Sequence, residues 1–294
     1  MTDELSLRGG VVVIGGGTMG QGIATAALMS GLSTTVVDVD GAMLQRAEAT
    51  IARRIRRARD KDAATVLAGL TLSTDMLSAV ADAAVVIEAV PEIVELKISI
   101  FAQLADAARA TALLVSNTST MSITRLADAA AGSGRVIGMH FFNPAHKMPL
   151  VEVVTASSTT PLTVRDALAL ATALGKDPIL VKDVPGFVTS RLGLLLGSEA
   201  MRMVEEGVAP AADIDKAMRL GYGHPMGPLE LADLVGLDVR LNNLKSMQQR
   251  SDATQYRVPR ILQRLVDDGN LGKKTKSGFY RYDTDGHPIL PGRL

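Results

Sequence analysis

Apolar runs of strand length alternate with amphipathic segments over roughly the first 180 residues of this chain. In the amphipathic segments apolar residues recur with the period of a helix, whereas the apolar runs are short and rich in valine and isoleucine. Strands and helices in alternation require crossover connections, so the pattern predicts an α/β fold with a mostly parallel sheet. The expected strands lie at residues 11–14, 34–37, 84–87, 112–115, 136–142, 150–154 and 178–181.

The pattern changes near Pro185, and the residues beyond it are predicted to form helices only. Helices are expected at residues 187–206, stopped by Gly207, and at 211–220, stopped by Gly221, with further helical segments to about residue 268. We therefore expect two domains, an α/β domain at residues 1–184 and an all-α domain at residues 185–294.

The first predicted strand runs directly into a glycine-rich turn, Gly15-Gly16-Gly17-Thr18-Met19-Gly20, and then into a helix at residues 19–30. Strand, G-x-G-x-x-G turn and helix in this order bind the pyrophosphate of a dinucleotide, because the helix N-terminus presents free N–H groups. We expect Gly15 to allow the tight turn and Gly17 to let the backbone approach the pyrophosphate. Gly20 would allow close packing of the helix on the strand.

An acidic residue, Asp38, follows the second predicted strand, about 20 residues beyond the glycines, where a carboxylate accepts hydrogen bonds from the ribose hydroxyls of NAD. Its charge would repel the 2′-phosphate of NADP, and no arginine follows it immediately. The sequence therefore predicts a Rossmann-like domain that binds NAD. Its cofactor site would comprise Gly15, Gly17, Thr18, Met19, Gly20 and Asp38.

Composition narrows the class of protein. The chain has 294 residues, of which 47% are hydrophobic, and its formal net charge is zero, so a sizeable core is expected and nucleic-acid binding is not. Without cysteine it can form neither disulfides nor thiolate metal sites. Residues 1–10 lack the apolar core of a signal peptide, and no apolar run is long enough to span a bilayer. We expect a cytoplasmic protein with no membrane partner.

Two residues on consecutive strands form a candidate acid/base dyad. His140 ends an apolar strand and Glu152 lies within the next, so a hairpin centred near residue 146 would bring their side chains face to face. Imidazole, with an unperturbed pKa of about 6.5, can take the hydroxyl proton of an alcohol as hydride leaves the same carbon. Glu152 would orient the ring and stabilise the imidazolium. The alternative is a structural histidine at a strand end.

The most marked run of charge extends from Arg53 to Lys61. Ile51, Ile55 and Ala58 recur at helical spacing, which places the basic side chains largely on the outer face of a helix. One interpretation is a solvated helix face. The other is that some of these cations hold the phosphates of a nucleotide-bearing substrate, since guanidinium groups bind phosphate bidentately.

Other polar residues give weaker signals. Ser119 lacks the G-x-S-x-G setting of a nucleophile, and its alternative role is to cap the following helix. His146 follows Pro144, which interrupts the strand geometry that would aim His146 and His140 at one metal ion. No H-E-x-x-H spacing is present, so metal binding is not expected.

A set of short motifs recurs in one order along nearly the whole chain. After the glycine turn they are residues 88–92 (EAVPE) leading to Leu96-Lys97, 116–119 (SNTS), 140–144 (HFFNP), 148–152 (MPLVE), 185–187 (PGF), 221–231 (GYGHPMGPLEL) and 274–280 (KTKSGFY). With these motifs the chain resembles the NAD-dependent 3-hydroxyacyl-CoA dehydrogenases, including the short-chain 3-hydroxybutyryl-CoA enzymes. The resemblance implies a Rossmann-like N-terminal domain, a helical C-terminal domain that mediates homodimerisation, and an active site in the cleft between them.

The resemblance also implies roles for individual residues. His140 corresponds to the catalytic base and Glu152 to its carboxylate partner. Ser119 corresponds to a serine that hydrogen-bonds the substrate oxygen, and Asn143 to an asparagine beside the nicotinamide. Further implied contacts are those of Asp38, Glu92, Lys97, Ser119 and Asn143 with the cofactor, and those of Arg54 and Lys61 with coenzyme A.

One position departs from the family pattern. Family members commonly have asparagine three residues after the phenylalanine of Pro-Gly-Phe, near the substrate, and this chain has Ser190. A serine keeps one donor and two acceptor lone pairs but reaches less far, so it affects substrate placement more than reaction type.

The expected activity is the NAD-dependent interconversion of an (S)-3-hydroxyacyl-CoA and its 3-oxoacyl-CoA. Two alternatives stay open at this point. The same scaffold could oxidise a β-hydroxy acid that carries no coenzyme A, or the chain could bind NAD without catalysis.

Overall fold

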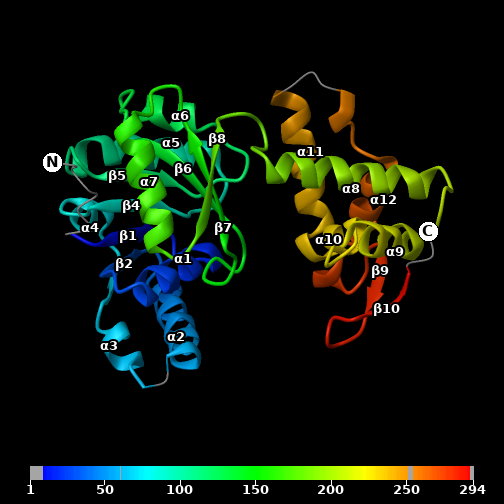
Figure 1. Ribbon diagram of the computed structural model, residues 1–294, viewed down its shortest axis with the longest axis horizontal. Helices are drawn as coiled ribbons and strands as arrows, with labels where there is room; N and C mark the ends of the chain where they lie inside the picture. The colour runs from blue at the N-terminus through cyan, green and yellow to red at the C-terminus, as the bar shows by residue number, and fades with distance from the viewer. Residues whose placement is uncertain (1–8, 60, 251–253, 292–294) are drawn as a thin grey trace. The chain divides into compact units, whose positions relative to one another are not determined.

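The computed structural model describes residues 9–59, 61–250 and 254–291 and divides after Phe187 into two compact units (Figure 1). The sequence pattern places the boundary between residues 184 and 185. The first unit carries a large sheet, and the second is built mainly from helices.

The first unit contains an eight-stranded sheet in the order β3-β2-β1-β4-β5-β6-β7-β8. Neighbouring strands from β3 to β6 pair in parallel, β7 runs antiparallel to β6, and β8 is parallel to β7. The predicted, mostly parallel α/β fold is therefore confirmed. The strands are β1 (Val11–Ile14), β2 (Thr34–Val37), β3 (Leu70–Ser73), β4 (Val85–Glu88), β5 (Leu113–Ser116), β6 (Val136–Phe141), β7 (Leu150–Thr155) and β8 (Asp177–Lys182).

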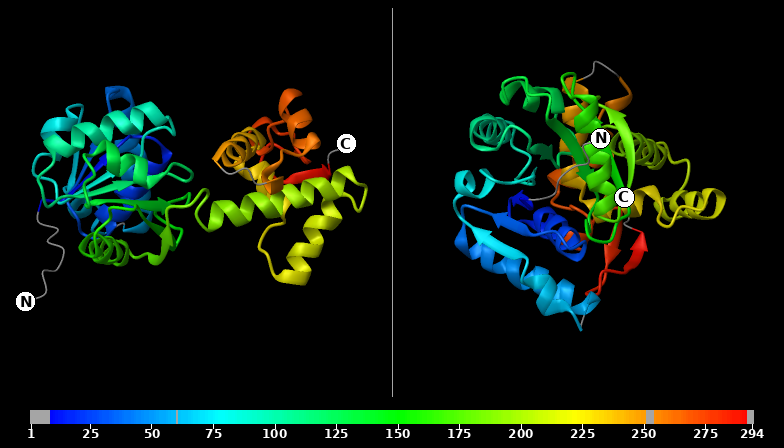
Figure 2. Two further views of the ribbon diagram at one scale, coloured as in Figure 1. Left: turned by 90° about the horizontal axis from the view of Figure 1, so that it is seen from above. Right: turned by 60° about the vertical axis from the view of Figure 1, so that its left-hand side comes forward.

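Helices cover both faces of this sheet (Figure 2). Along β1, Val11 and Val13 pack into the core beneath α1, α2 and α7, whereas Val12 and Ile14 pack into the core beneath α4, α5 and α6. Burial on both faces is typical of parallel sheets and explains why these strands are continuously apolar. The helices are α1 (Thr18–Met29), α2 (Gly41–Ala58), α3 (Ala63–Leu67), α4 (Met76–Val80), α5 (Val94–Ala107), α6 (Ile123–Ala129) and α7 (Pro161–Ala173).

The second unit has its own core, in which Leu229, Leu244 and Phe279 are fully or almost fully buried. A small antiparallel sheet of β9 and β10 adds to the expected helices. The elements are α8 (Thr189–Glu205), α9 (Ala211–Tyr222), α10 (Pro228–Val235), α11 (Leu237–Arg250), η1 (Thr254–Tyr256), α12 (Arg260–Asp267), η2 (Lys273–Thr275), β9 (Tyr280–Tyr282) and β10 (Pro288–Pro291).

Some predicted details are wrong. Helix α8 begins at Thr189 rather than at 187, because Phe187 adopts a left-handed backbone conformation with φ of 50°. Gly221 lies inside α9, and the helix ends instead at Gly223, whose φ of 71° gives the left-handed cap. Ala58, expected on the apolar face of its helix, is exposed, although Ile51 and Ile55 are fully buried as predicted. Strand β3, at the sheet edge, has no counterpart among the predicted strands.

The carboxyl ends of the parallel strands meet at one edge of the sheet. Asp38 follows β2, and Glu88 and Ser116 are the last residues of β4 and β5. His140 is the next-to-last residue of β6. In open α/β sheets ligands bind outside this edge, where the strand order reverses. No helix in the described ranges has the length and apolar character needed to cross a bilayer.

Candidate active site

The glycine turn between β1 and α1 leaves room for a ligand against the backbone. Gly15 has a φ of 108°, and a Cβ on Gly20 would lie 1.8 Å from the Gly15 carbonyl oxygen, so neither position accepts a side chain. A Cβ on Gly17 would meet nothing within 4 Å, and α1 has no side-chain cap at its N-terminus. Thr18 is exposed and Met19 half-buried at the start of the same helix. The residues present therefore fit the pyrophosphate of a dinucleotide.

Asp38 is tied to the glycine turn. Its Oδ2 accepts a hydrogen bond of 2.8 Å from the Gly16 N–H, and its Oδ1 accepts one of 3.0 Å from the Asp40 N–H. The side chain is half-exposed at the carboxyl end of β2. The carboxylate thus lies beside the phosphate-binding turn, with surface left for the ribose hydroxyls of a cofactor.

His140 and Glu152 face each other across the β6–β7 pair. They are register partners, and His140 Nδ1 lies 2.7 Å from Glu152 Oε2. The imidazole keeps 11% of its surface exposed, whereas the Glu152 side chain is fully buried. An ionised carboxylate only accepts hydrogen bonds, so Nδ1 carries the proton and Nε2 is left as the basic atom. This pairing holds one tautomer and directs the base away from Glu152.

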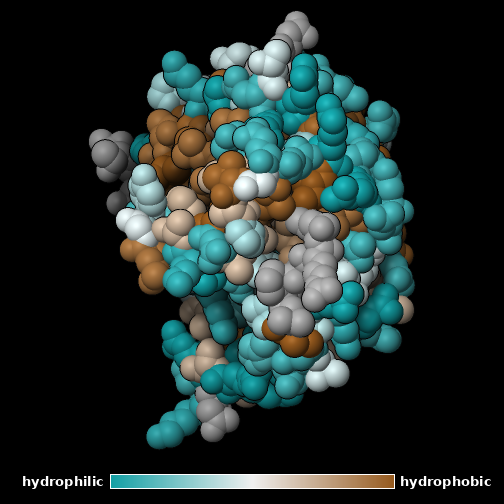
Figure 3. All heavy atoms as spheres, turned by 90° about the vertical axis from the view of Figure 1, so that its right-hand side faces the viewer, coloured by the Kyte–Doolittle hydropathy of each residue, from teal (hydrophilic) through white to brown (hydrophobic). Residues whose placement is uncertain are grey.

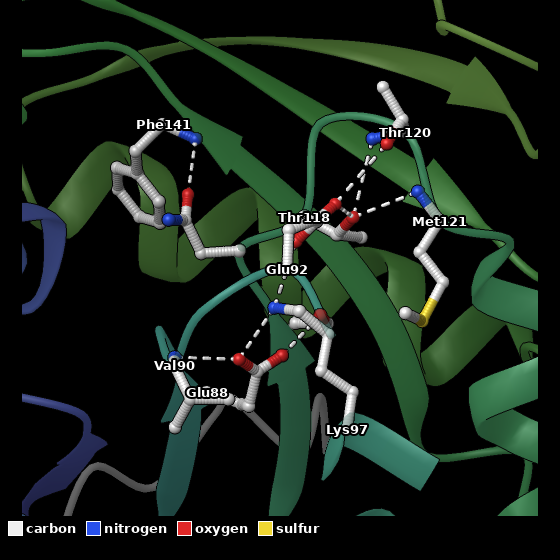
Figure 4. A network of polar contacts seen from close by, with 10 residues as sticks. Glu88, Val90, Glu92, Lys97, Thr118, Thr120, Met121 and Phe141 are labelled. Atoms are coloured by element: carbon white, nitrogen blue, oxygen red, sulfur yellow. Dashed lines mark hydrogen bonds and ion pairs between the residues drawn. The ribbon is translucent and has the colours of Figure 1, made fainter. Parts of the chain in front are cut away.

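Neighbouring groups hold the end of β6 in place. The Phe142 ring centre lies 4.5 Å from that of His140, and the Phe187 ring centre lies 6.0 Å away, both at tilted angles. Asn117, just beyond β5, accepts a hydrogen bond of 3.0 Å from the Phe141 N–H through its side-chain oxygen (Figure 4). The imidazole is thereby fixed by its own strand and by the neighbouring one.

Ser119 lies in the turn after β5, half-buried. It does not cap the following helix, because Ser122 caps α6 by accepting from the Arg125 N–H. The turn is held by Thr118, whose hydroxyl contacts Glu92 and accepts a hydrogen bond of 2.9 Å from the Met121 N–H. Within the described part of the chain, Ser119 makes no side-chain hydrogen bond of its own. Its hydroxyl is therefore available to a ligand.

Lys97 is not at the protein surface, although a direct contact with the cofactor would require an exposed side chain. Its side chain is fully buried, and its Nζ lies 2.7 Å from Glu88 Oε1 and 3.1 Å from Glu92 Oε2 (Figure 4). Glu92 is the partly exposed member of the three, with 39% of its side chain accessible. Of these three side chains, Glu92 is therefore the one that is accessible to a ligand.

Basic groups gather around the loop between β6 and β7, which carries the exposed Asn143. Lys176 Nζ lies under the loop and donates to the carbonyl oxygens of Ala145 at 2.7 Å and Met148 at 3.0 Å. Burial lowers the pKa of His146, and the charges of Arg54, Lys147 and Lys176 lower it further. We term Arg54, Lys147 and Lys176, the three cations that act on His146, the loop cation cluster.

Arg54 has the environment of a group that lacks a counter-ion. Its Nη1 and the Nδ1 of His146 are buried without a hydrogen-bond partner among the described residues. Burial lowers the pKa of Arg54, and the charge of Arg53 lowers it further. The other neighbours in the basic run, including Arg56, Arg57 and Lys61, are exposed. The structure therefore separates Arg54 from the solvated face of α2.

Two further predicted substrate residues lie on other elements. Lys61 is exposed beyond the end of α2. Ser190 lies in the first turn of α8, in the second unit. Three potential metal ligands come together among the described residues at Asp283, Asp285 and His287, in the β9–β10 turn rather than around His140 or His146.

Sequence reasoning missed several groups that shape this site. Glu88 is the last residue of β4, a position similar to that of Asp38, which follows β2. An acidic residue at the carboxyl end of a strand was therefore the sequence signal that could have identified Glu88. Asn117 and Lys176 gave no such signal, because their partners are backbone groups 24 to 31 residues away in the sequence.

Comparison with known proteins identifies the family. Residues 10–184 match the family described as 3-hydroxyacyl-CoA dehydrogenase, NAD binding domain, and residues 186–282 match its C-terminal domain. The chain is 40% identical over 275 residues to a probable 3-hydroxybutyryl-CoA dehydrogenase of Deinococcus radiodurans, a match that covers 92% of this chain and 99% of the relative. It is 38% identical to the human mitochondrial hydroxyacyl-coenzyme A dehydrogenase, over 92% of this chain and 90% of the relative.

A solved structure agrees with both sequence matches. The crystal structure of (S)-3-hydroxybutyryl-CoA dehydrogenase from Ralstonia eutropha superposes with a TM-score of 0.89 at 38% identity, covering 93% of this chain and 99% of that one. An NAD-binding domain and a C-terminal domain of one family thus account for almost the whole sequence in the same order. This chain belongs to the 3-hydroxyacyl-CoA dehydrogenase family.

Proposed function

We propose that this protein interconverts (S)-3-hydroxyacyl-CoA and 3-oxoacyl-CoA with NAD, and that His140 moves the proton. The observation that carries this proposal is the buried Glu152 carboxylate 2.7 Å from His140 Nδ1, which leaves Nε2 as the only basic ring atom. The pair lies at the sheet edge that also carries the glycine turn and Asp38. Proton and hydride chemistry thus have their groups on one surface.

In the oxidative direction, His140 Nε2 takes the proton of the hydroxyl group that C3 of the substrate carries, and the resulting imidazolium donates through Nδ1 to Glu152. NAD, when bound, supplies the acceptor for the hydride that leaves the same carbon. In the reductive direction the imidazolium returns the proton to the carbonyl oxygen. Glu152 favours the charged ring in both directions, since a buried carboxylate beside an imidazolium forms an ion pair.

Ser119 and Asn143 are the proposed polar contacts around the reacting groups. The Ser119 hydroxyl, which has no other partner in the described part of the chain, would donate to the substrate oxygen as charge develops there. Asn143, exposed in the loop that follows β6, would bind the nicotinamide amide. Ser190, in the first turn of α8, is a further proposed substrate contact. Its hydroxyl would act directly or through a bridging water.

The loop cation cluster supports a coenzyme A ester over an unesterified β-hydroxy acid. Arg54 has a buried Nη1 without a partner, and Lys147 and Lys176 lie within electrostatic range of His146. A buried guanidinium nitrogen without a hydrogen-bond partner is costly unless a bound anion compensates it. The phosphates of coenzyme A are suitable anions, whereas a free hydroxy acid carries a single carboxylate.

The activity is tested by following NADH absorbance with a panel of 3-oxoacyl-CoA esters from acetoacetyl-CoA upward, including a dicarboxylic one. Ranking by kcat/KM identifies the acyl chain that the pocket prefers. Absence of turnover with every ester, in protein that binds NADH, would leave the non-catalytic alternative as the better account.

Charge reversal separates the two substrate classes. Arg54→Glu should raise KM for the CoA ester about tenfold, equivalent to about 1.4 kcal/mol, because a charge-assisted phosphate contact is lost. The N-acetylcysteamine thioester of the same acyl group lacks phosphates and should be unaffected. Arg57→Glu, on the exposed part of the same helix, is the matched control. Equal effects of both variants on both substrates would favour the alternative without coenzyme A.

The second unit supports a proposal of homodimerisation. Leu192, Leu220 and Tyr222 expose 63%, 78% and 77% of their surface, and exposed apolar side chains that form a patch mark protein interfaces. Hydrophobic atoms gather over part of the face in Figure 3. Sedimentation of wild type and of Leu220→Glu would show a dimer and its weakening. The cytoplasmic location stays a prediction from the sequence.

A further inference from the structure

Three charged side chains at the end of β4 form a cluster with an odd number of charges. Lys97 Nζ lies between Glu88 Oε1, at 2.7 Å, and Glu92 Oε2, at 3.1 Å. Two carboxylates and one ammonium leave one negative charge in excess. Because Glu88 and Lys97 are fully buried, Glu92, which is 39% exposed, is the member of the cluster that a ligand can approach most closely.

Glu92 is held in position as well as charged. One of its oxygens contacts the Thr118 hydroxyl, and the Thr120 hydroxyl lies 3.4 Å from the same oxygen. Burial would raise the pKa of Glu92, but the Lys97 ammonium and the hydrogen bonds from Thr118, Lys97 and Thr120 outweigh it and hold the pKa below its usual range. The carboxylate is therefore ionised at neutral pH.

The second acid of the cluster is anchored in the same way. Glu88 accepts hydrogen bonds from the Val90 N–H at 2.8 Å and from the Ser116 hydroxyl at 2.6 Å (Figure 4). Its donors come from the turn after β4 and from the end of β5. The cluster is thus built into the framework of the sheet, and its charge cannot move far from the sheet edge.

The strand order fixes which half of a dinucleotide this cluster faces. The order reverses between β1 and β4, and the crevice at that point binds the cofactor. Asp38, the acid for the adenosine ribose, follows β2 on one side of the crevice. Glu92 follows β4 on the other side, together with the β5 turn and the β6 strand that carry Ser119 and His140. The cluster therefore lies on the side of the nicotinamide.

We propose that Glu92 makes the cofactor site discriminate between the two redox forms of NAD, in favour of the oxidised form. The two forms differ in charge only at the nicotinamide ring, which is positive in NAD⁺ and neutral in NADH. A fixed anion on that side of the crevice attracts one form and not the other. This inference rests on the proposed function for the site but concerns cofactor binding, which is measurable without substrate.

The discrimination has a consequence for catalysis. Tighter binding of NAD⁺ than of NADH lowers the reduction potential of the bound couple, by about 30 mV for each tenfold ratio of dissociation constants. Among enzyme-bound species this favours the hydroxyacyl ester with NAD⁺ over the oxoacyl ester with NADH. The second buried anion of the site, Glu152, is paired with His140 and is left unchanged by substitutions at Glu92.

The test is Glu92→Gln, which removes the charge and keeps the size of the side chain. Calorimetry for NAD⁺ and fluorescence quenching or enhancement for NADH give both dissociation constants. We expect NAD⁺ binding to weaken roughly five- to tenfold and NADH binding to change by less than about twofold, since only the ring charge is sensed. Glu92→Ala is a second neutral variant and should lower the preference for NAD⁺ in the same direction.

Two controls separate charge from shape. Glu92→Asp keeps the charge and should retain most of the wild-type ratio. Thr118→Val removes a hydrogen bond to Glu92 but no charge, so it should affect NAD⁺ and NADH equally. An unchanged ratio in a folded neutral variant overturns the inference, while turnover of 3-oxoacyl-CoA by the wild type would leave the proposed function intact. Conversely, wild type that binds both cofactors but turns over no CoA ester would overturn only the proposed function.

Discussion

Buried carboxylates serve different ends in the two units. In the first unit, Glu152 contacts an imidazole that keeps 11% of its surface exposed, and Glu88 contacts an ammonium shared with the accessible Glu92. In the second unit, Asp215 and Asp233 are buried to the same degree. Their oxygens, however, accept hydrogen bonds mainly from backbone N–H groups.

The pattern of donors in the second unit is that of a fixed framework. Asp215 accepts from the N–H groups of Leu229 and Glu230, each at 2.8 Å, and so caps the start of α10. Asp233 accepts from the N–H groups of Phe279 and Tyr280, at 3.0 and 2.9 Å. Two tyrosine hydroxyls complete the set, that of Tyr280 on Asp215 at 2.7 Å and that of Tyr282 on Asp233 at 2.9 Å.

Burial alone therefore does not distinguish a chemical carboxylate from a structural one. The distinction lies in the partner: an imidazole has a second nitrogen that can face a substrate, whereas a backbone N–H has nothing further to offer. The glycines next to the aspartates fit the same reading. A Cβ on Gly278 would lie 2.1 Å from Asp233 Oδ1, and one on Gly227 would lie 2.2 Å from Asp215 Cβ.

The largest expected effect is on His140. Replacing it by glutamine should lower kcat by about 10² to 10⁴, because the general base is lost while the amide can still donate to Glu152. NAD affinity should stay close to that of the wild type. Stopped-flow or steady-state NADH kinetics with acetoacetyl-CoA measure the first quantity, and calorimetry measures the second. Turnover near that of the wild type would show that His140 is not the general base. Glu152 would then be a structural carboxylate, like Asp215 and Asp233 of the second unit.

The sequence predicts a region well when the residues that interact there lie close together along the chain, and poorly when they lie far apart. The His140–Glu152 pair could be predicted because both residues belong to one hairpin, where alternation along two strands determines which side chains meet. The glycine turn could be predicted because strand, turn and helix are contiguous. Asp233 could not, since its donors lie 46 to 49 residues away and no local pattern connects them.

The burial of Lys97 shows a second limit. Along α5 its neighbours give no sign that an ammonium lies between two acids, because Glu88 belongs to β4 and Glu92 lies outside the helix. The resemblance to the family indicates a cofactor contact but not whether it is direct. Strand β3 shows a third limit. It is short and only partly buried at the sheet edge, so its pattern is weak, and its identity as a strand comes from pairing with β2.

An intermediate effect is expected on the stability of the second unit. Burial raises the pKa of Asp233 to about 6, although hydrogen bonds from Phe279, Tyr280 and Tyr282 oppose the rise. Between about pH 4 and pH 6, Asp233 is therefore protonated in the folded protein and ionised in the unfolded chain. The stability from this proton is fully present below about pH 4 and is lost as pH rises through about 6. This proton should contribute about 2–3 kcal/mol to the free energy of unfolding at low pH, relative to its contribution well above pH 6.

Urea unfolding at pH 4.5 and pH 7 measures this effect. All four tyrosines of the chain lie beyond residue 188 and tryptophan is absent, so tyrosine fluorescence reports on the second unit. The free energy of unfolding of Asp233→Asn should lack the pH-dependent component that the wild type shows. Asp213→Asn, at an exposed position in α9, is the control and should keep that component. Equal pH profiles for wild type and Asp233→Asn would contradict the assignment.

The smallest expected effect is at Asp38, which combines the two uses of a carboxylate. Its Oδ2 accepts from the Gly16 N–H, as the aspartates of the second unit do, while its half-exposed surface faces the cofactor crevice. Asp38→Asn keeps an oxygen for the backbone donor and removes the charge that repels a 2′-phosphate. The preference of kcat/KM for NAD over NADP should fall about tenfold, equivalent to about 1.4 kcal/mol.

Comparison with Asp38→Ser separates these two uses. The serine variant lacks both the charge and a carboxylate-length acceptor, so it should show the same loss of discrimination together with weaker binding of both cofactors. If Asp38→Asn left the kcat/KM preference for NAD over NADP unchanged, the Asp38 carboxylate would have only a structural role, like Asp215 and Asp233 of the second unit. If only the asparagine variant retained tight NAD binding, the hydrogen bond to Gly16 would account for cofactor affinity and the charge for cofactor choice.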